Sequence, residues 1–144
     1  MKMTIERQDD IARIRRSWAR VAAGGDVVAR LFYIRLFEIS PQTRAMFGTG
    51  MSDQARKLMQ TLNWIVDHVD QPAALAPEAR ALAVRHVSYG VRPDQYPAVG
   101  QALIDTLSAS LGDDFNEKDA AAWGRVYGTL SALMIAAAYP DEAQ

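Results

Sequence analysis

Apolar residues recur three or four positions apart along most of the chain, which is the spacing of one face of an α-helix. The first such run extends from Ile11 to Val21 and ends at Gly24 and Gly25. The alternation of apolar and polar residues that indicates a β-strand is missing from this run. The pattern therefore predicts an all-α fold.

The second predicted helix, from Asp26 to about Ser40, is apolar on most of its circumference. Leu31 and Ile34 belong to this wide apolar surface, which also includes Phe32 and Phe37. A helix that is apolar over so broad a surface is expected to lie between several neighbours. We therefore expect this helix to contact several other elements.

The remaining helices are separated by short polar segments that contain Gly, Pro or capping residues. Ser40 and Pro41 are expected to open a short helix, as N-cap and first-turn proline. Asn116 is expected to cap the last helix. The longer helices are predicted over about 52–69, 76–89, 94–111 and 117–139. About seven helices result, in one domain of residues 1–144 with frayed ends at about 1–8 and 140–144. The unequal helix lengths favour a layered fold over a regular four-helix bundle.

The helix that contains His86 is the chemically distinctive one. Pro77 suits its first turn because the missing N–H would be unbonded there, and Glu78 suits the positive end of the helix dipole. His86 follows Leu82 by one turn and projects from a mostly aliphatic face. A histidine in this position is either a hydrogen-bonded core residue or a ligand.

Composition excludes several classes of site. The chain has no cysteine, which excludes disulfides, thiolate zinc sites, iron–sulfur clusters ligated by cysteine and a thiol nucleophile. Its formal net charge of −1 gives no indication of nucleic-acid binding. Arg13, Arg15, Arg16 and Arg20 are expected to form one solvated helix face.

The location of the protein is a further expectation from sequence. The longest apolar run, Leu130 to Tyr139, is far shorter than the ~20 residues that cross a bilayer. The N-terminal residues have neither the apolar core nor the small-residue cleavage site of a secretory signal. We therefore expect a cytoplasmic protein without a membrane span.

Motifs spread over nearly the whole chain resemble the bacterial globins. The segments ARALAVRHVSYGVRPDQYPAVGQALIDTL and AAWGRVYG are similar to the haem domain of flavohaemoglobins and to Vitreoscilla-type single-domain haemoglobins. This resemblance implies a globin fold that sandwiches haem b. The residues that carry it are Phe32-Tyr33, Pro41, Phe47, Gln54 with Leu58, His86, Tyr96-Pro97, and Trp123 through Tyr127.

On one side of the haem, the resemblance implies His86 as the iron ligand. The Leu82 carbonyl, one turn earlier, can accept a hydrogen bond from the other imidazole nitrogen and orient the ring. Arg85 is either a partner for a haem propionate or a solvated cation, and Phe47 is either a wedge against the porphyrin or an ordinary core residue. Further cofactor contacts are expected from Val91, Tyr96, Val99 and Tyr127.

On the other side, the resemblance implies Tyr33 and Gln54 as a distal pair. A phenol and an amide are costly to bury without partners, so the pair suits a polar guest such as dioxygen. Leu58, one turn after Gln54, is expected to close the pocket. Lys57 either reaches a propionate or has no role, and Tyr33 could instead bond a backbone carbonyl.

Ala138 departs from the family pattern. Flavohaemoglobin-like globins have a glutamate there, in a hydrogen-bonded triad with the residues that match Tyr96 and His86. Without this carboxylate, His86 is expected to donate less electron density to the iron, which weakens peroxidase-like chemistry. The chain also ends just past the globin, so an enzymatic cycle is expected to need a separate reductase.

Three functions remain open from the sequence. The first is a haem b globin that binds O2, NO and CO reversibly, with or without nitric oxide dioxygenase activity. The second is a gas-sensing globin, and the third is a haem-free helical interaction module. A homodimer is compatible with each of them.

Overall fold

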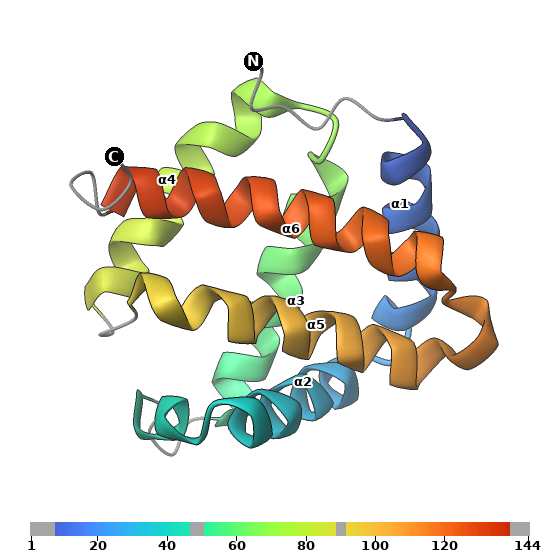
Figure 1. The fold of residues 1–144 in the computed structure, drawn as a ribbon, viewed down its shortest axis with the longest axis horizontal. Coiled ribbons are helices and arrows are strands. Elements are labelled where there is room, and N and C mark those ends of the chain that lie inside the picture. Colours follow the sequence, from blue (N-terminus) through green and yellow to red (C-terminus); the bar gives the residue numbers. More distant parts are fainter. Residues whose placement is uncertain (1–7, 47–50, 89–91, 139–144) are drawn as a thin grey trace.

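The described part of the chain is built from helices. A computed structural model describes residues 8–46, 51–88 and 92–138, which contain six α-helices, three 3-10 helices and no strand (Figure 1). They are α1 (Gln8–Ala22), α2 (Asp26–Ile39), η1 (Pro41–Met46), α3 (Met51–Asp67), α4 (Pro72–Ser88), η2 (Pro93–Gln95), α5 (Tyr96–Leu111), η3 (Gly112–Asp114) and α6 (Glu117–Ala138). The all-α prediction is confirmed, and the short helix after Ser40 is a 3-10 helix.

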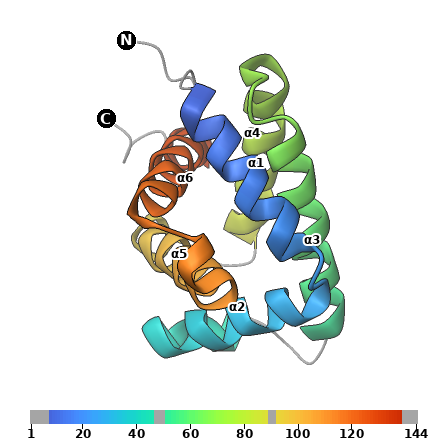
Figure 2. The ribbon, with the colours of Figure 1, turned by 90° about the vertical axis from the view of Figure 1, so that its right-hand side faces the viewer.

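The helices cross in layers. In Figure 1, α5 and α6 run side by side, and α3 crosses behind them. The closest packing is between α2 and α5, between α4 and α6, and between α1 and α6 (Figure 2). This arrangement differs from the near-parallel helices of a four-helix bundle, as the helix lengths predicted.

Buried apolar side chains form two separate clusters. The larger cluster joins α1, α2, α3, α5 and the first half of α6. The smaller cluster consists of Ala79, Ala83, Tyr96 and Met134, from α4, α5 and the second half of α6. Among the described residues, α4 packs mainly on α6 and has little contact with α2 or α3. The packing of α4 therefore forms a small satellite cluster apart from the main core.

The start of α4 differs from the prediction. The helix begins at Pro72, and Pro77 lies inside it. The Gln71 carbonyl accepts hydrogen bonds from the N–H groups of Ala74 and Leu75, 3.0 Å each, which closes the first turn. Pro72 therefore occupies the early position that we assigned to Pro77. Both prolines are suited to the first turn of a helix, and the local sequence does not favour one over the other.

The arginines of α1 are only partly solvated as predicted, because Arg16 and Arg20 are exposed while Arg13 is largely buried. Arg15 donates to the carbonyls of Val66 and Asp67, at 3.4 and 3.2 Å, and to the Asp70 carboxylate at 3.0 Å. These contacts satisfy carbonyls at the C-terminal end of α3, where a cation is favoured. Arg20 pairs with Asp114 at 2.8 Å. The basic residues thus connect α1 to other elements.

Asp119 is the most connected of these carboxylates. It accepts from Arg13 at 3.0 Å and Arg16 at 3.1 Å, and its side chain is 2% exposed. It also accepts from the Asn116 N–H, while Asn116 Oδ1 accepts from the Asp119 N–H, both at 3.0 Å. This reciprocal pair is a capping box, so the predicted Asn116 cap is confirmed. Asp119 therefore both starts α6 and joins it to α1.

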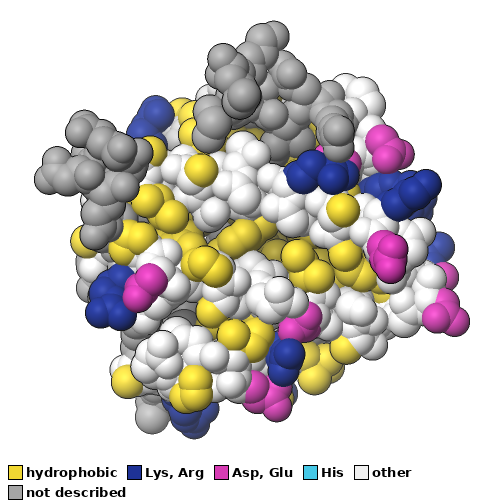
Figure 3. All heavy atoms as spheres, in the orientation of Figure 1, with side chains coloured by type: hydrophobic (Ala, Val, Ile, Leu, Met, Phe, Trp, Pro, Cys, Tyr) yellow, Lys and Arg dark blue, Asp and Glu magenta, His cyan; other side chains and the backbone are white. Residues whose placement is uncertain are grey.

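Contrary to the prediction, Leu31 and Ile34 are not covered by neighbouring helices. They are 45% and 58% exposed, and Val27 on the same side of α2 is 59% exposed. The buried face of α2 is formed instead by Ala29, Phe32, Tyr33 and Leu36. Apolar side chains are visible over α2 and along the junction of α5 and α6 on the face shown in Figure 3. One side of α2 therefore enters the core and the other leaves apolar residues in contact with solvent.

No helix in the described ranges combines the length and the apolar composition that crossing a bilayer requires.

Candidate functional site

The His86 ring is held by a backbone carbonyl of its own helix. His86 Nδ1 lies 2.8 Å from the Leu82 carbonyl oxygen, the contact expected from their spacing. A carbonyl can only accept, so Nδ1 carries the proton in this contact. In the neutral ring the lone pair then resides on Nε2. The hydrogen bond thus selects the tautomer that presents Nε2 as a metal ligand.

The surroundings of His86 favour its neutral form. Burial lowers the pKa of the imidazole, the Leu82 carbonyl acts in the opposite direction, and the charge of Arg85 lowers the pKa further. A lowered pKa leaves the imidazole unprotonated at neutral pH, as a metal ligand must be. The ring centroid of Tyr96 lies 6.4 Å away, so an aromatic ring borders the imidazole.

Tyr127 fixes the backbone around Tyr96. Its hydroxyl donates to the Tyr96 carbonyl at 2.6 Å, and burial raises the pKa of this phenol. The Tyr127 ring lies over Gly100, where an added Cβ would stand 2.6 Å from a ring carbon. Only glycine allows this approach without a shift of the ring. Ala138 packs against the same small cluster as Tyr96.

Tyr33 is buried in the main core and clamped by aromatic rings. Phe32 meets it edge-on with ring centroids 5.2 Å apart, and Phe37 stacks on it at 6.1 Å. Burial raises the pKa of the Tyr33 phenol to about 12. The hydroxyl therefore keeps its proton at neutral pH and can act as a hydrogen-bond donor.

The other predicted distal residues lie on α3, which packs against α2. Gln54 and Leu58 are half-buried and one turn apart on the same side of the helix, and Leu58 packs against the main core. Lys57 is exposed and pairs with Asp53 at 3.3 Å. This ion pair directs Lys57 along the surface of its own helix.

The predicted residues divide between the two parts of the core, but Val99, expected on the His86 side, lies against the main cluster. Tyr33, Leu58 and Val99 belong to or pack against the main cluster. Leu82 and Tyr96 belong to or pack against the small cluster, and His86 lies on the same helix as Leu82. Arg85 is exposed. Phe47 and Val91 lie outside the described residues.

Two contacts of this site were missed in the sequence. The stacking of Phe37 on Tyr33 follows from a spacing of four residues on one helix, which places two side chains one turn apart. Gly100 within a predicted helix was the other available signal, because glycine inside a helix commonly marks a close packing contact. Both contacts fix a tyrosine, Tyr33 in one case and Tyr127 in the other.

Comparison with known proteins gives a consistent result. The family model described as Globin matches residues 30–134. The flavohemoprotein of Deinococcus radiodurans is 34% identical over 116 residues, and that of Rhodopirellula baltica is 32% identical over 118 residues. These matches cover 78% and 80% of this chain but only 29% of each relative.

Solved structures resemble the whole fold. An engineered carbene transferase from Rhodothermus marinus, itself a candidate nitric oxide dioxygenase, superposes with a TM-score of 0.84 and 26% identity, over 96% of this chain and 97% of the other. A double mutant of Aplysia limacina myoglobin superposes with a TM-score of 0.81 at 20% identity, over 90% of this chain and 97% of the other. The second likeness concerns the fold alone.

Proposed function

Because the chain belongs to the globin family, we propose that it binds haem through His86 and accommodates small diatomic ligands beside Tyr33 and Gln54. The observation that carries this proposal is the hydrogen bond from His86 Nδ1 to the Leu82 carbonyl at 2.8 Å. It orients the ring and leaves the Nε2 lone pair available, which is what an axial ligand requires.

The division of the core supports the fit of a haem. Tyr33 and Leu58 lie with the main cluster, whereas Leu82 and Tyr96 lie with the small one, next to His86. A flat, largely apolar group held between the two clusters would join them and bury apolar surface of both. We propose haem b as this group, with further contacts from Phe47, Arg85, Val91, Val99 and Tyr127, and from Lys57 if it exchanges Asp53 for a propionate.

The distal residues supply polarity in an otherwise apolar environment. When bound, haem supplies the iron at which dioxygen, nitric oxide and carbon monoxide bind. Tyr33 is protonated and clamped by Phe32 and Phe37, so its phenol is an oriented donor for a polar guest. Gln54 offers a second donor from α3, and the apolar Leu58 excludes water.

Nitric oxide dioxygenase activity is a second proposal, supported by the likeness to flavohemoproteins and to the Rhodothermus marinus protein. The overall reaction, NO + O2 + e− → NO3−, consumes one electron in each turnover. We propose a separate reductase as the electron source. Ala138 in place of the family's glutamate leaves His86 without a carboxylate that would strengthen it as a donor, which favours ligand binding over peroxidase-like chemistry. The single domain over residues 1–144, the cytoplasmic location and a homodimer stay predictions.

Titration of the full chain with haemin tests the haem proposal directly. We expect a saturable Soret band with one haem per chain that survives desalting, because an axial ligand and apolar burial both retain the group. A chain that is folded by circular dichroism but retains no haem would contradict the proposal. Such a result would favour the haem-free interaction module.

Substitution of Tyr33 by phenylalanine tests the distal site. The variant keeps the ring and its contacts with Phe32 and Phe37 but loses the hydroxyl. We expect dioxygen to dissociate roughly tenfold faster, since one hydrogen bond of about 1.5 kcal/mol corresponds to that factor. Stopped-flow measurement on the haem-loaded protein gives the rate, and an unchanged rate would exclude Tyr33 as the donor.

A further inference from the structure

The exposed large apolar side chains of the described residues lie on only two helix faces. On α2, Val27, Leu31 and Ile34 are 59%, 45% and 58% exposed, and on α4, Val84 and Val87 are 63% and 43% exposed. Scattered exposed apolar residues need no explanation, but clustered ones indicate interaction surfaces. Two such faces on one chain raise the question of whether they fit each other.

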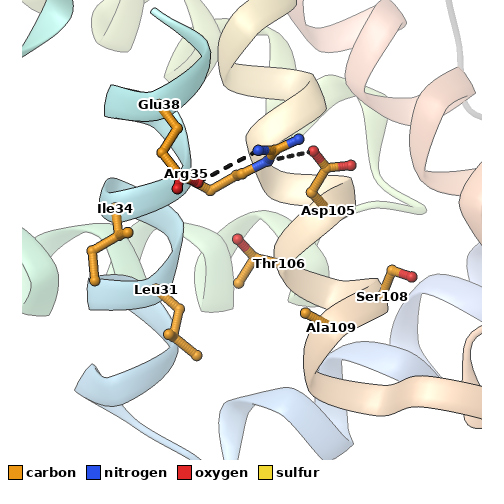
Figure 4. Close-up of a pocket in the computed structure, with 8 residues that line it drawn as sticks. All are labelled: Leu31, Ile34, Arg35, Glu38, Asp105, Thr106, Ser108 and Ala109. Carbon is orange, nitrogen blue, oxygen red and sulfur yellow. Dashed lines mark hydrogen bonds and ion pairs between the residues drawn. The ribbon is translucent and has the colours of Figure 1, made fainter. Parts of the chain in front are cut away.

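The face on α2 continues into a groove with a charged end. The groove lies between α2 and α5, has a volume of about 450 Å³ and is lined by Leu31, Ile34 and Ala109 among others (Figure 4). Arg35 reaches across it from α2 to Asp105, at 2.7 Å, and also pairs with Glu38 at 3.4 Å.

Two carboxylates share one guanidinium at this end of the groove, so it carries a net negative charge. Glu38 is the more accessible of the two, with 61% of its side chain exposed against 26% for Asp105. An occupant with an apolar stripe and a cation at one end would complement both properties of the groove.

The outer face of α4 has these properties. Val84 and Val87 follow Arg80 at positions four and seven, so the three side chains lie in one stripe along the helix. Arg80 is exposed, and no described carboxylate lies within ion-pair distance of it. This stripe therefore presents a cation followed by two apolar residues.

The two stripes have matching spacing when the helices run in opposite directions. From Glu38 back along α2, the exposed positions follow at intervals of four and three, as they do forward from Arg80 along α4. Antiparallel packing sets Arg80 against Glu38, Val84 against Ile34, and Val87 against Leu31. In the heptad notation of coiled coils, each of these three facing pairs joins an a position of one helix to a d position of the other.

One flanking contact is unfavourable in this register. Arg35, beside the α2 stripe, faces the flank of α4 that carries Ala81 and, one turn later, the exposed Arg85. Arg35 is already paired with Asp105 and Glu38, which offsets its charge. Within one chain, α2 and α4 have little contact, and α4 packs on α6. The complementary faces can therefore meet only between molecules.

We propose that α4 of one copy of this chain packs antiparallel into the α2–α5 groove of a second copy. The contact is heterologous, because the two molecules contribute different faces. Its core is a few side chains on each partner, which places it at the small end of specific interfaces, below about 1,200 Å² in total. Association is therefore expected to be weak and to require a high protein concentration.

Analytical ultracentrifugation of the full chain over a concentration series tests the proposal. We expect reversible association that Glu38→Arg and Arg80→Glu each weaken about tenfold or more, because each places like charges together. An equimolar mixture of the two variants should associate again. The groove of the Glu38→Arg variant, now positive, can bind the α4 stripe of the Arg80→Glu variant, now negative. The groove of the second variant and the α4 stripe of the first keep their original charges and can also bind each other.

Matched charge reversals at exposed positions outside the contact, Asp113→Arg and Lys118→Glu, should associate like the parent chain. Ile34→Gln gives a second test without a change in charge and should also weaken association. A chain that sediments as a monomer at every concentration overturns the proposal. So does association that the variants leave unchanged, or a mixture that stays monomeric.

Discussion

Replacement of His86 by alanine is expected to abolish stable haem binding. The imidazole is the only proposed axial ligand, and the Leu82 carbonyl already fixes its orientation and tautomer. Loss of residues that merely orient a ligand costs 10–100-fold in metal affinity, so loss of the ligand itself should cost more than about 100-fold. The measurement is the Soret absorbance that remains after haemin loading and desalting, compared with the parent chain.

His68 provides the matched control, because the chain has two histidines. Its ring stacks on Trp64 at 4.1 Å, and its Nδ1 contacts the Trp64 carbonyl at 2.8 Å, so it makes the same backbone contact just after the end of α3. His68→Ala should keep the haem. Added imidazole should restore haem binding to His86→Gly by occupying the vacated position. Equal haem retention by His86→Ala and the parent would show that another residue binds the iron.

Asp119→Ala is expected to destabilise the fold by about 3 kcal/mol, which lowers Tm by about 10 °C. The substitution removes the carboxylate that pairs with Arg13 and Arg16 and breaks the capping box with Asn116. We place the effect at the low end for a buried ion pair because the side chain of Arg16 is 55% exposed and can be solvated. Thermal and urea unfolding, followed by circular dichroism, give the change.

Asp119→Asn separates the two roles of the carboxylate. Asparagine can still accept from the Asn116 N–H, so this variant loses the charge but keeps the cap, and it should fall between the parent and Asp119→Ala. Asp113→Ala removes an exposed acid near the same helix start and should change stability little. Loss of less than about 0.5 kcal/mol in Asp119→Ala would show that Arg13 and Arg16 gain nothing from it.

The stability difference between the parent chain and Asp119→Asn should depend on pH, and the pKa of Asp119 gives its direction. Burial alone would raise the pKa of Asp119, but the Asn116 N–H and the two guanidinium groups outweigh burial and lower it below its ordinary value of 3.8. The stabilisation is therefore complete above about pH 4 and is lost as the pH falls through the lowered pKa of the folded state. The stability difference between the parent and Asp119→Asn should shrink over that acidic range.

The proposed ligand set came from the resemblance to bacterial globins, whereas the local spacing showed only which side chains share a helix face. His86 and Leu82 are one turn apart on one helix, as are Gln54 and Leu58, so helical geometry alone places each pair on one side. The distance from His86 Nδ1 to the Leu82 carbonyl agrees with that geometry. The separation of the distal and proximal sets into two clusters could not be read this way, since it depends on how α4 packs relative to α3.

Apart from the start of α4, the errors concern partners that are distant in sequence. The arginines of α1 were assigned to solvent, yet Arg13 and Asp119 meet across 106 residues. Leu31 and Ile34 were expected to contact neighbouring helices, yet they are exposed beside α5. Local patterns show that a side chain is charged or apolar, but they do not show which element comes to lie against it.

The sequence by itself determined the helices, their approximate ends and the residue types available for haem binding, because helical periodicity and capping act over a few neighbouring positions. Tertiary structure alone decided that the core divides in two, that Asp119 joins α1 to α6, and that one apolar side of α2 faces outward. These features arise when helices choose among alternative neighbours. That choice depends on the summed packing of the whole chain, which no short window of sequence contains.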